Sequence, residues 1–228
     1  MPALAVRNPP TRVIVAVAAI WFASDIGYYL IRSLIGRDSS YSANPFTLAA
    51  YYLFWVCVAF IAFWNLYKKW RMVTFDLSMI GIIALIAFLV AGYITFIFPN
   101  FAPIHWLSYI KPPPEIFTAS PWYFLPKSIE IILQQLLVAA MVLALDARGY
   151  TMREVADWSA TLFGGAHLAL VFGQTFAYMV FFTLCATVAG FIFPYLLLRV
   201  KNGFLYTYTL HWTFYAVIII LIRVLYVH

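Results

Sequence analysis

The chain has 228 residues, of which 65% are hydrophobic and 10% are charged, and its formal net charge is +6. Soluble domains carry about 25% charged residues, so the composition excludes an ordinary water-soluble protein. The positive charge does not indicate nucleic-acid binding, because the Lys and Arg residues stand singly or in small groups between apolar runs. We therefore expect an integral membrane protein that contacts the lipid bilayer and binds no nucleic acid.

Seven apolar segments predict an all-α, polytopic transmembrane helical bundle of about seven spans. In chain order they are 13–34, 46–67, 75–98, 127–146, 158–173, 175–199 and 203–226. A span needs about 20 residues, so the fifth segment is short, and it forms either a tight hairpin with the sixth or one broken helix. We interpret 1–228 as a single integral membrane domain, with three N-terminal helices in 1–98, a loop at 99–126 and a helical core in 127–228.

The loop at 99–126 is the longest segment between predicted helices. It carries Trp106, Tyr109, Trp122 and Tyr123, and such amphipathic rings favour the boundary between lipid and water. We therefore expect this loop to lie on the membrane surface.

The distribution of Lys and Arg predicts the orientation. If the N-terminus is cytoplasmic, the inside segments hold nine basic residues, namely Arg7, Arg12, Lys68, Lys69, Arg71, Arg148, Arg153, Arg199 and Lys201. The outside segments then hold five, namely Arg32, Arg37, Lys111, Lys127 and Arg223. Cytoplasmic loops are enriched in Lys and Arg, so we expect a multi-pass protein of the cell (inner) membrane with its N-terminus in the cytoplasm.

Four ionisable residues in the predicted spans are candidates for burial in the membrane, namely Asp25, Glu130, His167 and His211, whereas Asp76 and Arg223 lie near helix ends and can reach the interface. Charged groups cost about 2.5–3.5 kcal/mol at the centre of a membrane helix, so each such residue is a candidate for function. Gln134 shares a helix face with Glu130, and for Asp25 we favour a structural hydrogen bond. The two cysteines lie in apolar runs and form no metal or redox motif, so we expect no metal.

The order of three short motifs resembles a known family. These are Glu130 within SIEIILQQ, Phe163-Gly164-Gly165-Ala166-His167, and His211-x-x-x-Tyr215. The CAAX prenyl endopeptidase and bacteriocin-processing family (CPBP, or Abi) of intramembrane proteases carries EExxxR, FxxxH and HxxxN on separate helices. The resemblance covers roughly residues 127–220 and implies a CPBP-like core in helices four to seven.

The resemblance also implies catalytic roles for four residues. Glu130 would deprotonate a water, His167 and His211 would stabilise the oxyanion, and Tyr215 would donate a hydrogen bond in place of the family's Asn. Gly164 and Gly165 would let another backbone approach closely beside the second motif.

The departures from the family pattern concern the same site. If Glu130 matches the second Glu of the first motif, Ile129 replaces the first and Gln134 replaces the Arg. If it matches the first Glu, Gln135 replaces the Arg. Loss of the Arg would leave the charge of Glu130 uncompensated. We therefore favour a non-catalytic scaffold, chaperone or accessory subunit for other integral membrane proteins, without a cofactor.

Two alternatives stay open at the level of sequence. One is an active CPBP-type endopeptidase that cleaves membrane-associated or prenylated peptides. The other is a haem-binding membrane protein in which His167 and His211, on different helices, ligate the iron.

Overall fold

The computed structural model describes residues 10–35, 40–102, 115–172 and 175–226, and within these ranges the ordered elements are all helical. The longer helices are α1 (Thr11–Ile35), α2 (Pro45–Tyr67), α3 (Leu77–Gly92), α4 (Phe124–Asp146), α5 (Met152–Ala166), α6 (Phe176–Arg199) and α7 (Gly203–Tyr226). The short ones are a π-helical turn η1 (Tyr93–Ile97) and the 3-10 turns η2 (Phe98–Asn100), η4 (Glu115–Phe117), η5 (Pro121–Tyr123) and η6 (His167–Phe172). Six of the helices are long and apolar enough to cross a bilayer. The chain is therefore a multi-pass integral membrane protein.

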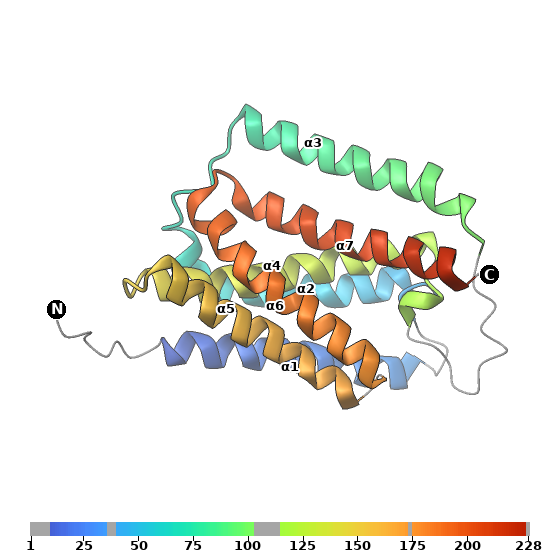
Figure 1. Cartoon of the computed structure of the whole chain (residues 1–228), viewed down its shortest axis with the longest axis horizontal. Helices are drawn as coiled ribbons and strands as arrows, with labels where there is room; N and C mark the ends of the chain where they lie inside the picture. The colour runs from blue at the N-terminus through green and yellow to red at the C-terminus, as the bar shows by residue number, and fades with distance from the viewer. Residues whose placement is uncertain (1–9, 36–39, 103–114, 173–174, 227–228) are drawn as a thin grey trace.

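Helix α4 is the centre of the bundle, and the other helices except α3 pack around it (Figure 1). In the most apolar 18-residue stretch of the span that contains α4, 72% of the residues are buried inside the protein. The corresponding share is 17–33% for α1, α2, α6 and α7. Small and branched side chains such as Ala139, Ala140 and Val142 have no exposed surface. Residues on α4 are consequently the ones best placed to contact several other helices at once.

Helix α3 lies apart from the rest of the bundle, along the outer side of α7 (Figure 1). None of the residues Leu77–Gly92 is buried. The helix is attached near its two ends. Before it, the Thr74 amide donates to Asn202 Oδ1 at 2.9 Å, and beyond it the Tyr93 hydroxyl donates to the Ala216 carbonyl at 2.9 Å.

Asp76 connects the start of α3 to the turn between α6 and α7. Its carboxylate pairs with Lys201 and also accepts hydrogen bonds from the Ser78 hydroxyl and the Met79 amide. The Lys201 ammonium, together with these two donors, holds the pKa of Asp76 well below its usual range. The carboxylate therefore stays charged at neutral pH, as the N-cap of a helix prefers.

Helices α5 and α6 form the hairpin that was one of the two expectations for the short fifth segment. Helix α5 begins at Met152, earlier than the predicted 158, because Thr151 and Glu154 form a capping box. With η6 it extends for about 34 Å at the usual helical rises, enough to cross a hydrocarbon core of about 30 Å.

Two glycines bring α5 and α6 together. A Cβ atom added at Gly190 would lie 2.4 Å from Cα of Ala160, and one at Gly164 would lie 2.2 Å from Oγ1 of Thr187. Gly165, in contrast, has nothing within 4 Å of that position. The expectation of a close approach at both Gly164 and Gly165 is therefore correct for the first and wrong for the second.

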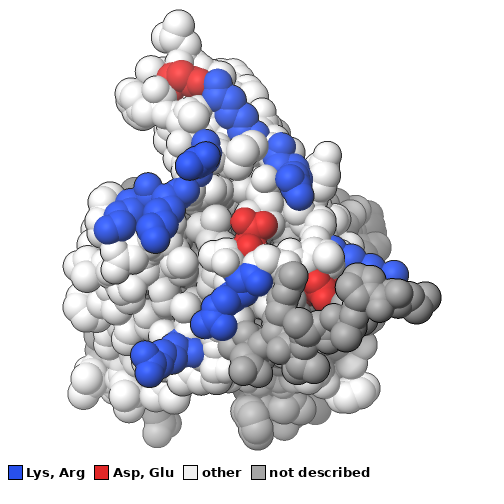
Figure 2. All heavy atoms as spheres, turned by 90° about the vertical axis from the view of Figure 1, so that its left-hand side faces the viewer, with Lys and Arg blue, Asp and Glu red and all other residues white. Residues whose placement is uncertain are grey.

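Eight of the nine basic residues assigned to the inside gather at one end of the bundle, and the ninth, Arg7, lies outside the described residues. They occupy the start of α1 and the connections α2–α3, α4–α5 and α6–α7, which lie together on the left in Figure 1. Figure 2 shows Lys and Arg side chains spread over this end. The grouping supports the predicted orientation, which stays a prediction.

Three basic residues that were counted as outside lie within helices, namely Arg32 on α1, Lys127 on α4 and Arg223 on α7. Lys127 on α4 is 7% exposed and Arg223 on α7 is 4% exposed. Arg223 donates to the carbonyls of Phe101 and Ala119 and lies over the ring of Phe98. None of these three residues marks a loop between helices, and the other two of the five, Arg37 and Lys111, lie outside the described residues.

The 99–126 loop is only partly superficial. Trp122 is 56% exposed, as expected of an interfacial residue, but Tyr123 is 4% exposed and packs against Tyr41 and Phe124. The expectation for Tyr123 is therefore wrong, because the ring fills the end of the bundle. Trp106 and Tyr109 lie outside the described residues.

We predict that Gly190→Ala destabilises the protein by about 1–3 kcal/mol, because the new methyl group meets backbone atoms of α5. Gly165→Ala is the matched control and should cause no loss, since its Cβ enters open space and Ala favours the helix. Unfolding of both variants in mixed micelles measures the difference. Equal stability of the two would contradict the contact.

We predict that a cysteine at position 69 is labelled by a membrane-impermeant maleimide in inside-out vesicles and not in intact cells. The background is Cys57→Ser with Cys185→Ser, and Trp122→Cys at the opposite end is the control with the reverse pattern. Labelling of position 69 from outside intact cells would refute the orientation.

Candidate functional site

A buried ion pair on α4 forms the polar centre of the bundle. Lys127 and Glu130 lie three residues apart, so one helix turn places both on the same face. Nζ of Lys127 lies 3.0 Å from Oε1 and 2.9 Å from Oε2 of Glu130. The two residues are 7% and 8% exposed. The expectation of an uncompensated charge on Glu130 is therefore wrong, because Lys127 supplies the opposite charge.

Two further donors complete the hydrogen bonding of the Glu130 carboxylate. The Tyr41 hydroxyl donates to Oε2 at 2.6 Å, and Nε2 of Gln134 donates to Oε1 at 2.9 Å. The Tyr52 hydroxyl lies 2.5 Å from that of Tyr41 and extends the network to α2. Each carboxylate oxygen thus has two donors, which is an ordinary full set for a buried carboxylate.

Lys127 also links Glu130 to the third motif. Its Nζ lies 4.1 Å from the centre of the Tyr215 ring, a cation–π contact. The Tyr215 ring in turn stacks on His211, with the centroids 5.5 Å apart and the planes 24° from parallel. Three of the four candidate residues therefore lie in one continuous set of contacts.

His211 is held from α4. Its Nδ1 lies 2.9 Å from Nε2 of Gln135, and both side chains are buried. Gln135 is the residue that replaces the family's Arg in one of the two alignments of the first motif. Here it positions an imidazole on α7 and makes no contact with Glu130 that would replace that Arg.

His167 directly follows α5, so it lies at the end of the helix that was expected to contain it. Its Nδ1 donates to the Phe163 carbonyl at 2.8 Å, which is a direct consequence of the four-residue spacing on a helix. The Phe163 ring contacts both histidines, with centroids 5.1 Å from His167 and 6.1 Å from His211. The intact FxxxH motif thus places a phenyl ring beside both imidazoles.

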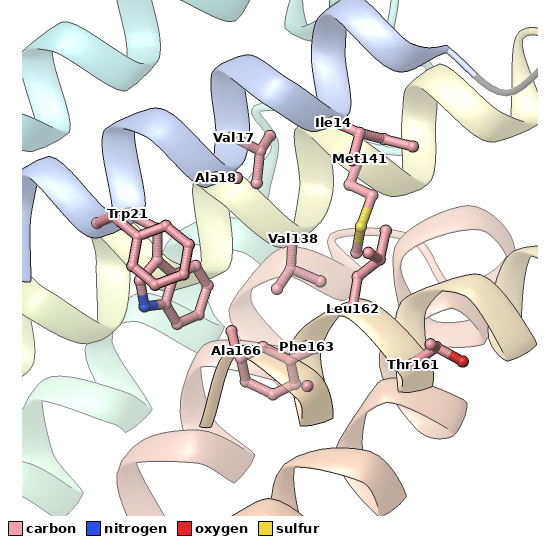
Figure 3. A pocket seen from close by; sticks show the side chains of 12 residues that line it. Ile14, Val17, Ala18, Trp21, Val138, Met141, Thr161, Leu162, Phe163 and Ala166 are labelled. Atoms are coloured by element: carbon pink, nitrogen blue, oxygen red, sulfur yellow. The ribbon is translucent and has the colours of Figure 1, made fainter. Parts of the chain in front are cut away.

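Two cavities lie on either side of Phe163. One of about 380 Å³ lies among α5, α6 and α7 and is lined by His167, His211 and Tyr215 together with mostly apolar side chains. The other, of about 240 Å³, lies among α1, α4 and α5, and Figure 3 shows Trp21 and Phe163 facing each other across it. Among the described residues that line these cavities, neither Lys127 nor Glu130 occurs.

Several members of this site were not identified from the sequence. Lys127 was counted among the outside basic residues, at the start of the fourth predicted helix, and its pairing with Glu130 was not considered, although a spacing of three residues is a usable signal for a pair on one helix face. Tyr41 and Tyr52 come from distant segments, and no spacing connects them to α4. Asp25, which the sequence did single out, accepts a hydrogen bond from the Trp21 side chain on its own helix and interacts electrostatically with both Glu130 and Lys127.

We next consider whether the described side chains could ligate a metal ion or a haem iron. Within the described ranges, no group of three or more His, Cys, Asp or Glu side chains is arranged to hold a metal ion. In His211 the nitrogen Nδ1 accepts from Gln135, so Nε2 carries the ring proton and has no lone pair for iron. Ligation of a haem iron by His211 through Nε2 would require the opposite orientation of the Gln135 amide.

A comparison with protein-family models finds no match for the chain, and no curated protein or solved structure matches it either.

We predict that Glu130→Gln destabilises the protein by about 3–5 kcal/mol, because it leaves the Lys127 ammonium buried without a counter-charge. The double variant Lys127→Met with Glu130→Gln should recover most of this loss. The measurement is the free energy of unfolding of the variants in mixed micelles.

The control for this set of variants is the exposed ion pair of Arg153 and Asp157, in which Nε of Arg153 lies 4.0 Å from Oδ2 of Asp157. Asp157→Asn should change stability by less than about 1 kcal/mol. If Glu130→Gln has an effect as small as that of Asp157→Asn, the buried pair does not have the stabilising role described.

Proposed function

We propose that the chain is a non-catalytic scaffold or accessory subunit that binds other integral membrane proteins. The observation that carries this proposal is the complete hydrogen bonding of Glu130 by Lys127, Tyr41 and Gln134. A general base needs a free lone pair within hydrogen-bond reach of the water that it deprotonates. The Glu130 oxygens have protein donors instead, and the residue does not border the cavity of His167 and His211.

The position of α3 supports binding of a partner. This helix belongs to a strongly apolar span, and only 6% of the residues in its most apolar 18-residue stretch are buried within the protein. Gly81, Ala84 and Ala87 are exposed on it, and small residues let a second helix approach closely inside a membrane. We propose that α3 is the contact for a transmembrane helix of the partner.

The second candidate function is an intramembrane peptidase with a CPBP-like core. Its support is that His167, His211 and Tyr215 line one cavity. These residues belong to the second and third motifs of the resemblance to that family. This activity would require Glu130 to exchange at least one of its protein donors for a water. The two candidates therefore differ in whether the Glu130 carboxylate ever exchanges a protein hydrogen-bond donor for a water.

We predict that the purified protein in nanodiscs cleaves neither a prenylated CAAX peptide nor a transmembrane peptide. The double variant Lys127→Met with Glu130→Gln serves as the folded reference without a carboxylate. Cleavage by the wild type that is lost in this variant would establish the peptidase, since removal of a positioned base costs at least about 100-fold in rate.

The partner contact is tested separately by photo-crosslinking in native membranes. A photoreactive residue at Phe88, which is 74% exposed on α3, should give one discrete protein adduct, and one at the buried Val138 should give none. The double variant should keep the Phe88 adduct, because the ion pair is remote from that surface. Adducts with lipid alone would argue against the scaffold.

A further inference from the structure

We propose that the cavity among α5, α6 and α7 is a binding site for a neutral aliphatic alcohol. The recognition groups for its hydroxyl would be the two imidazoles that line this cavity, those of His167 and His211. This inference does not depend on the scaffold role, because it concerns the occupant of a cavity that neither Lys127 nor Glu130 lines.

The hydrogen bond of His167 determines which of its nitrogens carries the proton. The partner of Nδ1 is the Phe163 carbonyl, at 2.8 Å, and a carbonyl oxygen only accepts. Nδ1 therefore donates. In the neutral ring Nε2 then bears the lone pair, so His167 can accept one further hydrogen bond.

His211 has the opposite arrangement. Its Nδ1 faces Nε2 of Gln135 at 2.9 Å, and an amide nitrogen only donates. With the Gln135 amide in this orientation, Nδ1 accepts and Nε2 of the neutral ring carries the proton. His211 can consequently donate one further hydrogen bond.

Both Nε2 atoms are available to an occupant of the cavity. The hydrogen bonds of the two rings involve Nδ1 alone, and neither Nε2 is among the fully buried atoms that lack a partner in the part of the chain that the structure describes. Both rings line the same cavity. The cavity thus offers one acceptor and one donor, which is the complement of a hydroxyl group.

The rest of the cavity selects for an uncharged, apolar ligand. Its described lining contains no Lys, Arg, Asp or Glu and is dominated by aliphatic and aromatic side chains such as Phe182, Ile192 and Phe193. A carboxylate or ammonium group would lose its hydration there without gaining a counter-charge. The volume of about 380 Å³ falls in the range of roughly 300–1,000 Å³ that is usual for small-ligand sites.

Cys185 provides a reporter for the test, because it lines the cavity from α6. In a Cys57→Ser background it is the single thiol of the chain. We expect dodecan-1-ol to slow its alkylation by a membrane-permeant maleimide in nanodiscs. Dodecane at the same concentration should protect about 5-fold less well, which corresponds to the loss of one ordinary hydrogen bond.

Two variants separate hydrogen bonding from simple filling of the cavity. His167→Phe keeps a ring but removes the acceptor, so dodecan-1-ol and dodecane should then protect equally. Ile192→Ala changes the apolar wall of the same cavity and should keep the preference for the alcohol. Equal protection by the two compounds in the wild type, better protection by dodecanoate, or no protection would each overturn the proposal.

The proton positions can be measured without any ligand, and this test does not require His167→Phe to fold. The chain has four histidines, and replacing His105 and His228 by Gln leaves only the two in the cavity. Nitrogen NMR should show Nδ1–H at one ring and Nε2–H at the other. Two rings with the same tautomer would contradict the complementary pair.

Discussion

The structure depends on one constraint, which is that the Lys127–Glu130 pair must be fully hydrogen-bonded inside an apolar bundle. A buried ion pair gains little unless its remaining donors and acceptors are satisfied. Here those partners come from three directions, since Tyr41 belongs to the α1–α2 connection, Tyr52 to α2 and Tyr215 to α7. The pair therefore determines how these elements attach to α4.

The same constraint separates the polar centre from the cavities. Every donor near Glu130 is engaged with the carboxylate, and the space beside Phe163 is left to apolar side chains and two imidazoles. Gln135 lies next to Gln134 in sequence but projects toward His211, because neighbouring helix residues are about 100° apart around the axis. One turn of α4 thus supports two environments of different chemistry.

The helices could be predicted from the sequence because apolar length is a direct signal in a membrane protein. The start of α5 was the exception, since its first turn carries Arg153 and Glu154 and reads as a loop. Half of the site followed from the motifs, namely the proximity of His211 and Tyr215 and the helical spacing of Phe163 and His167. Of the partners of Glu130, Gln134 followed from its spacing, but Tyr41 did not, because it is 89 positions away and only tertiary packing brings it near.

The hairpin of α5 and α6 has a consequence for how the chain enters the membrane. Helix α5, with 15 residues, is not among the described helices that are both long and apolar enough to cross alone, whereas α6 is. During synthesis α5 is therefore a poor stop signal, and its insertion is favourable when α6 follows and covers it through Gly164 and Gly190. Because α6 is what retains α5 in the lipid, the topology of the last three helices is decided after α6 has emerged from the ribosome and not before.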